Sequence, residues 1–241
     1  AGSVRASVPV RAADDLTAWS LADDGTISAA GGAWDAQQQT YAFDVISGVT
    51  AIACFPFADV PAGSWYYGAA AYAYNNGLFA GTTATTFAPD MTMTRAMLVS
   101  VLWRLAGEPA PKGTNTFDDV PDGTWYTDAV TWAAENGVVA GIGNGRFDPS
   151  GAVTREQTAV ILFNYAQSKG YDVSARADLS AFPDAGSVSD WAQDALAWAN
   201  ASGLISGAVR GTQTILDPQG SASRAQVAMI LMGYVEHVVN A

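Results

Sequence analysis

The sequence predicts a mainly α-helical protein in which three tandem helix–loop–helix units follow a small β segment. Three observations predict this fold: short motifs recur three times in the same order, each recurrence contains two stretches typical of helices, and the residues before them are rich in strand formers. We expect the β segment to span residues 1–54 and the three units, called copies one to three, to span 55–112, 113–176 and 177–241.

Composition limits the classes of function. The chain has 241 residues, of which 49% are hydrophobic, and this is enough to bury a core. A net charge of -12 argues against a nucleic-acid partner, because binding phosphates needs a basic face. No apolar run of about 18 residues is present, so we expect no membrane span. Residues 1–10 lack the apolar core of a signal peptide, which indicates a mature product or an excised fragment.

The β segment is marked by two runs of strand formers. Residues 40–46 and 49–54 are predicted strands, and Asp23–Gly25 and Gly31–Gly32 are predicted turns. Three or four short strands bury little alone, so we expect this part to pack on the helical units or to end a larger upstream β domain. The single cysteine, Cys54, excludes an internal disulfide and is expected to be a small buried hydrophobe.

Four motifs recur in a fixed order from residue 57 onward. Each copy opens on a Phe-x-Asp motif, has a Trp eight or nine residues later and then two glycines four residues apart, and ends on an arginine that follows Thr or Ser. Copies one and two are offset by 60 residues at every motif, while copy three carries small insertions. This self-similarity indicates a repeat architecture. The copies open at Phe57, Phe117 and Phe182.

Each copy is predicted to contain two helices. The first spans about residues 128–136 in copy two and ends where Gly137 can adopt the left-handed conformation. The second begins after the Thr or Ser, whose hydroxyl caps it; Gln157 and Gln226 complete a capping box, whereas Met97 cannot. Its apolar residues form one stripe per copy, and the three stripes are expected to share one core. They are Val99, Leu102, Trp103 and Ala106, then Ala159, Leu162, Phe163 and Ala166, then Ala228, Leu231, Met232 and Val235.

Aromatic residues in the first helices, at Tyr72, Trp132 and Trp198, have two interpretations. They could form a platform for stacking sugars, but aromatic residues at matching positions inside helices more often belong to the core. We therefore expect them to be buried.

The order of these motifs resembles the S-layer homology domain. The fullest match is copy two, with Phe117–Val120, Trp125–Tyr126, Asn136–Gly141, Phe147–Pro149 and Thr154–Gln157. The resemblance covers residues 57–239 and implies a pseudo-threefold, trimer-like arrangement around a central three-helix bundle, with grooves between copies. It also implies a secreted protein at the bacterial cell surface that anchors to the wall as a monomer.

The ligand that the resemblance implies is a secondary cell-wall polysaccharide, often ending in a pyruvylated sugar whose carboxylate meets the recurrent arginine. The residues support an anion site independently, because an arginine in the first turn of a helix opposes the helix dipole and needs compensation. An anion there could collect backbone N–H groups, the cap hydroxyl and the guanidinium. Alternatively, each arginine pairs with the aspartate of a Phe-x-Asp motif and ties the copies together.

The candidate ligand-binding residues are those that recur in the motifs. They are Arg95, Arg155 and Arg224 with Thr94, Thr154 and Ser223, then Trp65, Trp125 and Trp191 with Gly81, Gly141 and Gly207, and finally Asp59, Asp119 and Asp184, for which a capping role is the alternative. Copy two matches most fully, so its arginine is expected to face an occupied groove. No metal and no cofactor are expected.

Other functions are less well supported. The only histidine, His237, lies at the C-terminal end, and no nucleophile elbow or phosphate loop is present, so we do not expect an enzyme. The acidic run Asp118–Gly123 lacks the spacing of a helix–loop–helix calcium site and is explained by turn formation. A protein-binding adhesin or a peptidoglycan-binding anchor stays open as an alternative.

Overall fold

The computed structural model describes the backbone of six N-terminal strands and all of residues 55–240. The chain divides into two compact units. The first comprises Ala1–Ala62 with Thr83–Thr86, and the second comprises Gly63–Thr82 with Phe87–Ala241.

The N-terminal unit contains two three-stranded antiparallel sheets, with strand orders β1-β5-β4 and β3-β2-β6. The two predicted strands are confirmed as β5 and β6, but the unit has six described strands where three or four were expected. The predicted turns and the side chain of Cys54 lie outside the described residues. The strands are β1 (Val4–Pro9), β2 (Leu16–Leu21), β3 (Ile27–Ala29), β4 (Ala33–Asp35), β5 (Thr40–Val45) and β6 (Val49–Cys54).

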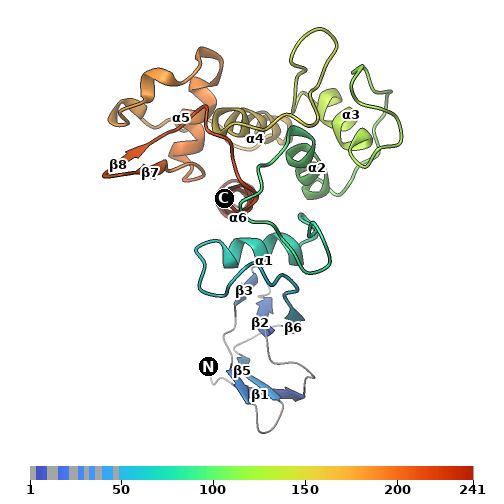
Figure 1. Ribbon diagram of the computed structural model, residues 1–241, viewed down its shortest axis with the longest axis vertical. Helices are drawn as coiled ribbons and strands as arrows, with labels where there is room; N and C mark the ends of the chain where they lie inside the picture. Colours follow the sequence, from blue (N-terminus) through green and yellow to red (C-terminus); the bar gives the residue numbers. More distant parts are fainter. Residues whose placement is uncertain are drawn as a thin grey trace. The chain divides into compact units, whose positions relative to one another are not determined.

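The second unit is helical, as predicted, and each copy contributes two helices (Figure 1). Copy three adds a short hairpin and two 3-10 turns where its sequence carries insertions, and one further 3-10 turn just before its opening Phe. The first helices are α1 (Tyr67–Asn75), α3 (Thr127–Glu135) and α5 (Gln193–Ala201); the second helices are α2 (Arg95–Leu105), α4 (Arg155–Lys169) and α6 (Arg224–Tyr234), which continues as a π-helix (Val235–Val239); the hairpin is β7 (Ala208–Arg210) with β8 (Gln213–Ile215).

The helix ends follow from their sequences. Gly137 follows the C-cap of α3 with a φ of 67°, the left-handed conformation predicted for it. At the start of α4, the Thr154 hydroxyl accepts from the N–H of Gln157, and the Gln157 side chain accepts from the N–H of Thr154. Copy three has the same capping box, and α2 has the threonine cap alone. All three predictions about these caps are confirmed.

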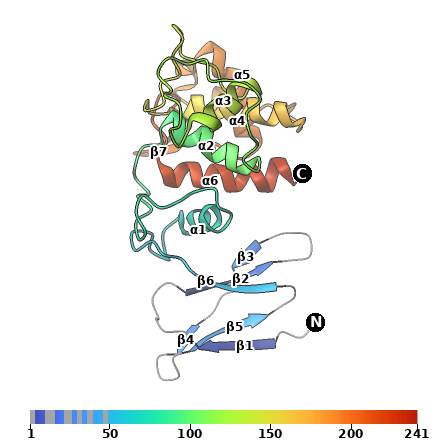
Figure 2. The same cartoon turned by 90° about the vertical axis from the view of Figure 1, so that its right-hand side faces the viewer.

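Helices pack across copies. The first helix of each copy packs on the second helix of the preceding copy, in the pairs α2 with α3, α4 with α5 and α6 with α1. Figures 1 and 2 show α6 lying between α1 and the pair α2 and α4. The predicted helical pairs therefore form between neighbouring copies, because the long loop inside each copy carries its second helix away from its first.

Three backbone hydrogen bonds close a ring at the helix starts. The N–H of Met93 donates to the carbonyl of Ala222, that of Ala222 to Val153, and that of Val153 to Met93, at 2.9, 3.1 and 2.9 Å. These residues are at most 1% exposed, and each immediately precedes a cap residue. The ring joins all three copies and fixes where the second helices begin.

The apolar stripes are buried at their first two positions in every copy, and in copy two also at Ala166. In α4, for example, Ala159 and Leu162 are fully buried, whereas Phe163 is half-buried. Among the aromatic residues expected in the core, Trp132 and Trp198 are 5% and 1% exposed, and Tyr72 is half-buried. Full burial of a large apolar side chain stabilises the fold by about 1.5–3 kcal/mol.

Candidate ligand-binding grooves

Arg155, the first residue of α4, is a buried cation with few partners in the protein. It is 6% exposed, and its Nε donates to the carbonyl of Leu216 at 2.8 Å. Within the described part of the chain this is the only hydrogen bond of a guanidinium that carries five N–H donors. Burial lowers the pKa of Arg155, while the charges of Asp217 and Asp184 raise it. None of its unbonded donors is enclosed by the described residues, so they are open to an acceptor that enters the groove.

The equivalent arginines of copies one and three are more fully engaged. Arg95 donates from Nε to the carbonyl of Phe147 at 2.8 Å and from Nη2 to that of Ala140 at 3.0 Å. Arg224 donates in the same way to Phe87 and Ala80, both at 2.7 Å. Each arginine therefore holds the loop of the next copy, and the last one returns to copy one.

The aspartates of the Phe-x-Asp motif bind the same loops from the other side. Asp119 accepts from the N–H groups of Phe147 and Asp148 at 2.7 and 2.8 Å. Asp184 accepts from Leu216 and Asp217 at 2.8 and 2.7 Å. Within residues 55–240, neither Arg95 and Asp119 nor Arg155 and Asp184 form the direct pair of the alternative; the two charged residues bind one shared peptide group instead. The aspartate binds its N–H side and the arginine its C=O side.

Asp59, the matching aspartate of copy one, lies in the N-terminal unit and is half-buried.

The helix starts are less open to an anion than the sequence suggests. The N–H groups of Arg155 and Glu156 donate to the carbonyls of Gly220 and Pro218 at 2.9 and 3.0 Å, and the third N–H donates to the hydroxyl of Thr154. Copies one and three repeat these bonds. The expectation that a ligand collects these N–H groups is wrong, since the neighbouring copy already binds them. The guanidinium is the donor that remains.

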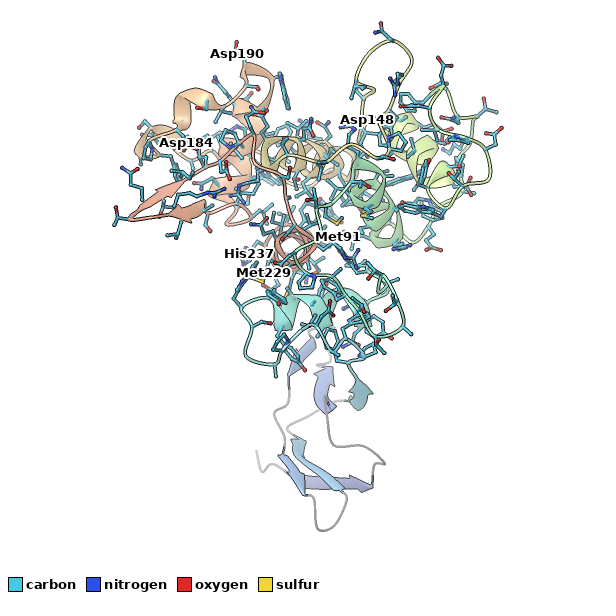
Figure 3. All side chains as sticks on the ribbon, in the orientation of Figure 1. Met91, Asp148, Asp184, Asp190, Met229 and His237 are labelled. Carbon is cyan, nitrogen blue, oxygen red and sulfur yellow. The ribbon has the colours of Figure 1, made fainter. Side chains whose placement is uncertain are left out.

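Two grooves lie beside these arginines. The first, called the Arg155 groove, has a volume of about 900 Å³ and brings Arg155 together with Trp65 and Gly207. Its wall includes residues 203–210 and Met229 of α6, which Figure 3 labels. The second, called the Arg95 groove, has a volume of about 560 Å³ and brings Arg95 together with Trp191 and Gly141. Each groove therefore takes its arginine, loop and tryptophan from three different copies.

The remaining candidates line neither of these grooves. Arg224 bonds the carbonyl next to Gly81, which follows the pattern of the Arg95 groove. Trp125 is 59% exposed, like Trp65 at 64% and Trp191 at 58%. The cap residues Thr94, Thr154 and Ser223 have their hydroxyl oxygens bonded to the third N–H of their helices.

The glycines of the grooves are required by close packing. A Cβ on Gly141 would lie 2.8 Å from Cε1 of Phe117 and 2.7 Å from the carbonyl oxygen of Arg146. A Cβ on Gly207 would lie 2.7 Å from Cγ2 of Thr214, and this glycine also has a φ of 102°. Any larger residue would displace the loop that forms the groove wall.

Sequence reasoning missed an aliphatic residue in each groove. Ile142 lines the Arg95 groove together with Trp191 and is 55% exposed. Val209 lines the Arg155 groove together with Trp65 and is 76% exposed. Ile142 lies one position after Gly141, and Val209 lies two positions after Gly207. An aliphatic residue so close to the recurrent glycine, in a predicted loop, was the sequence signal that could have identified them. Each pair offers a ligand two apolar surfaces.

A second arginine in the loops of copies two and three was also missed. Arg210 of the β7–β8 hairpin lines the Arg155 groove and bonds Asp217 at 3.1 Å. Arg146 of copy two bonds Asp119 at 3.4 Å. These exposed pairs add local charge near the grooves but little stability.

Among the described residues, no group of three or more potential metal ligands occurs. In the same part of the chain, no helix combines the length and apolarity needed to cross a bilayer. The only histidine, His237, is exposed, and its Nδ1 lies 3.1 Å from the carbonyl oxygen of Ser202.

The described residues define a class of protein, a tandem-repeat helical module with arginine-lined grooves where its repeats meet. A family model of the S-layer homology domain matches residues 56–96, 116–159 and 181–228. The chain belongs to the S-layer homology domain family, and the three matches confirm its three tandem copies.

The relatives are larger proteins. The chain is 31% identical over 162 residues to a surface-layer 125 kDa protein of Lysinibacillus sphaericus, with 67% of the chain and 13% of the relative covered. It is 33% identical over 161 residues to an amylopullulanase of Thermoanaerobacterium thermosulfurigenes, with 65% and 8% covered. An endoglucanase of Bacillus sp. (strain KSM-635) is 31% identical over 177 residues, with 73% and 18% covered. The chain thus spans less than a fifth of each relative's length.

These similarities establish a module for attachment at the cell surface. S-layer homology domains are non-catalytic anchoring modules, and the two enzymes are matched over only 8% and 18% of their lengths. Their names are therefore no evidence for catalysis by this chain. The family and the surface-layer relatives indicate a secreted protein located at the cell surface.

Proposed function

We propose that this chain anchors a surface protein to the bacterial cell wall by binding an anionic secondary cell-wall polysaccharide, with a pyruvylated sugar as the bound group, in the grooves between its copies. The observation that carries the proposal is Arg155, a residue that is 6% exposed, lines a groove of about 900 Å³ and makes one described side-chain hydrogen bond to the protein. A carboxylate in this groove would accept the remaining donors in the forked geometry that arginine favours.

The rest of the Arg155 groove suits a sugar. Trp65 and Val209 supply apolar surfaces on which the C–H face of a pyranose ring can lie. Ser221 and Gln226 supply polar groups for its hydroxyls. The Arg95 groove repeats this design with Trp191 and Ile142.

The charge balance permits an anionic ligand. The net charge is -12, but charges are screened over about 8 Å at physiological salt, so the guanidinium sets the potential inside its groove. A charge-assisted hydrogen bond contributes about 1.5–3 kcal/mol, which places one groove in the micromolar to millimolar range after binding costs.

The packing supports a pseudo-threefold monomer with copies at 55–112, 113–176 and 177–241. The ring of hydrogen bonds through Met93, Val153 and Ala222 is cyclic, and so are the helix pairs and the arginine-to-loop bonds. A chain whose contacts close on themselves needs no second subunit to complete them. By the same pattern, Arg224, Trp125 and Gly81 belong to a third groove.

The proposal is tested by binding to purified wall sacculi before and after chemical removal of the secondary polymer. We expect binding that is lost with the polymer and weakened at least tenfold by Arg155→Ala. Trp65→Ala, at an exposed position where folding is little affected, is expected to weaken it by about 3- to 10-fold. Lys112→Ala removes an exposed charge outside both grooves and should change nothing. Retained binding to stripped sacculi would instead indicate a peptidoglycan or protein partner.

A further inference from the structure

Glu156, the second residue of α4, is a buried carboxylate that none of the recurrent motifs explains. It is 2% exposed and has no cationic partner among residues 55–240. Ala96 and Ala225 occupy the matching positions of copies one and three. The second helices of copies one and three therefore begin without a carboxylate at this position. Burying a carboxylate costs free energy, so its presence in copy two needs an explanation other than helix initiation.

The carboxylate binds two separate segments of copy three. Its oxygens accept from the N–H and the hydroxyl of Ser189 at 3.1 and 3.0 Å, and from Nε2 of Gln219 at 2.7 Å. The backbone N–H of Glu156 also donates to the carbonyl of Pro218. Three donors to one carboxylate satisfy most of its acceptor capacity, which explains how a buried charge is tolerated.

The bound segment is the one that carries a groove tryptophan. Ser189 is the N-cap of the 3-10 turn Asp190–Ala192, which contains Trp191. Figure 3 labels Asp190 at the outer end of this segment. In copy three the Trp follows the opening Phe by nine positions, where the other copies have an offset of eight. Glu156 therefore holds the part of copy three that departs from the common spacing.

We infer that Glu156 is a positioning residue for the Arg95 groove: it fixes Ser189 and thereby sets where Trp191 stands at the groove mouth. This inference rests on the proposed function of the groove. An exposed indole has few contacts of its own to fix its place, since Trp191 is 58% exposed. A hydrogen-bonded anchor two residues away supplies the rigidity that a stacking surface needs before the ligand arrives.

The test uses protein labelled with 5-fluorotryptophan and a monovalent fragment of the wall polysaccharide. The ¹⁹F resonances of Trp191 and Trp65, assigned by substituting each with Phe, report the two grooves separately in one titration. For Glu156→Ala we expect the free Trp191 resonance to shift and broaden. The Kd measured at Trp191 should rise by about 3- to 10-fold, while the Kd at Trp65 changes less than twofold.

Two further variants separate positioning from general stability. In a Trp191→Ala background, the Kd of the Arg95 groove is read from the arginine Nε–H resonances. There Glu156→Ala should cause no further loss of affinity at this groove, although it should lower Tm as much as it does in the wild-type background. Glu156→Gln keeps an acceptor oxygen and the side-chain volume, and it should restore part of the affinity lost in Glu156→Ala.

Three results would overturn the inference. If Trp191→Ala weakens the Arg95 groove and Glu156→Ala does not, the positioning role is wrong while the proposed function stands. An equal loss from Glu156→Ala with and without Trp191 would show that it acts only through stability. If Arg95→Ala and Trp191→Ala both leave binding unchanged, the proposed function of this groove fails, and the positioning role fails with it.

Discussion

At the scale of single residues, the recurrent arginine and aspartate act on one peptide group. Asp119 accepts from the N–H of Asp148, and Arg95 donates to the carbonyl of Phe147, which belongs to the same peptide group. Arg95 and Asp119 thus need no ion pair with each other, and the loop between them is fixed on both sides. The same pattern at Leu216 leaves Arg155 with donors for a ligand, since its only described bond is the one to that carbonyl.

The loop aspartate makes stability depend on acid pH. Burial raises the pKa of Asp119. Hydrogen bonds from Phe147, Asp148 and Arg146 lower the pKa by more than burial raises it, so it lies below the ordinary value of 3.8. A carboxyl whose pKa is lower in the folded state stabilises the fold above its unfolded pKa and stops doing so as pH falls through its folded pKa.

We therefore predict that Asp119→Asn costs about 1–2 kcal/mol at pH 7 and that this cost shrinks as pH falls below about 3.8. Urea unfolding of both proteins between pH 7 and pH 2.5 measures the effect. Asp122→Asn, at an exposed position in the same turn, is the matched control. A cost that stayed constant across this range would contradict the assignment.

At the scale of helices, the start of each second helix combines a cap with a contact to the neighbouring copy. The hydroxyl satisfies the third N–H, and carbonyls of the next copy's turn satisfy the first two. All donors of the first turn are used in this way, so the helix begins inside the core without unsatisfied backbone groups. Copy one lacks only the reciprocal bond of the capping box, because Met97 has no amide.

This difference predicts a stabilising substitution. Met97→Gln should add the missing bond to the N–H of Thr94 and raise the free energy of unfolding by about 0.5–1 kcal/mol. Met97→Leu, which has no acceptor, is the control and should not stabilise. Thermal or urea unfolding measures both. Equal stability of the glutamine and leucine variants would show that the reciprocal bond contributes nothing here.

At the scale of the whole helical unit, each groove depends on all three copies. The Arg95 groove takes Arg95 from copy one, Gly141 from copy two and Trp191 from copy three. A single copy on its own therefore has no complete groove, and we expect the three copies to bind a ligand only as one unit.

Several sites on a repetitive polymer predict avidity. Arg95→Ala or Arg155→Ala alone should lower the number of bound monovalent fragments by one and leave the Kd of the other groove unchanged. The same single variants should weaken binding to the intact polymer by a factor of about 10 or more, since linked sites gain about 10² to 10⁴ in affinity. Calorimetry with the fragment and surface-binding measurements with the polymer provide the two readouts. Equal fold losses for fragment and polymer would mean that one groove acts alone.

Much of the fold and part of the site can be predicted from local sequence patterns. The three copies, the capping hydroxyls and the left-handed Gly137 follow from spacing and residue chemistry, because they depend on contacts within one helix or turn. The recurrent arginine was found in the same way, since a cation in the first turn of a helix conflicts with the helix dipole.

The recurring motifs predict three similar helical copies and the residues that they share. Which copies meet is visible only in the folded chain: the helix pairs form across copies, and neighbouring carbonyls bind the first-turn N–H groups. The exposed Ile142 and the buried Glu156 likewise meet residues of other copies. These contacts join residues that are far apart in the chain, and the spacing of residues within one motif does not indicate which distant residues meet in space. The contacts result from the packing of three loops, each of which is bound by the arginine of another copy.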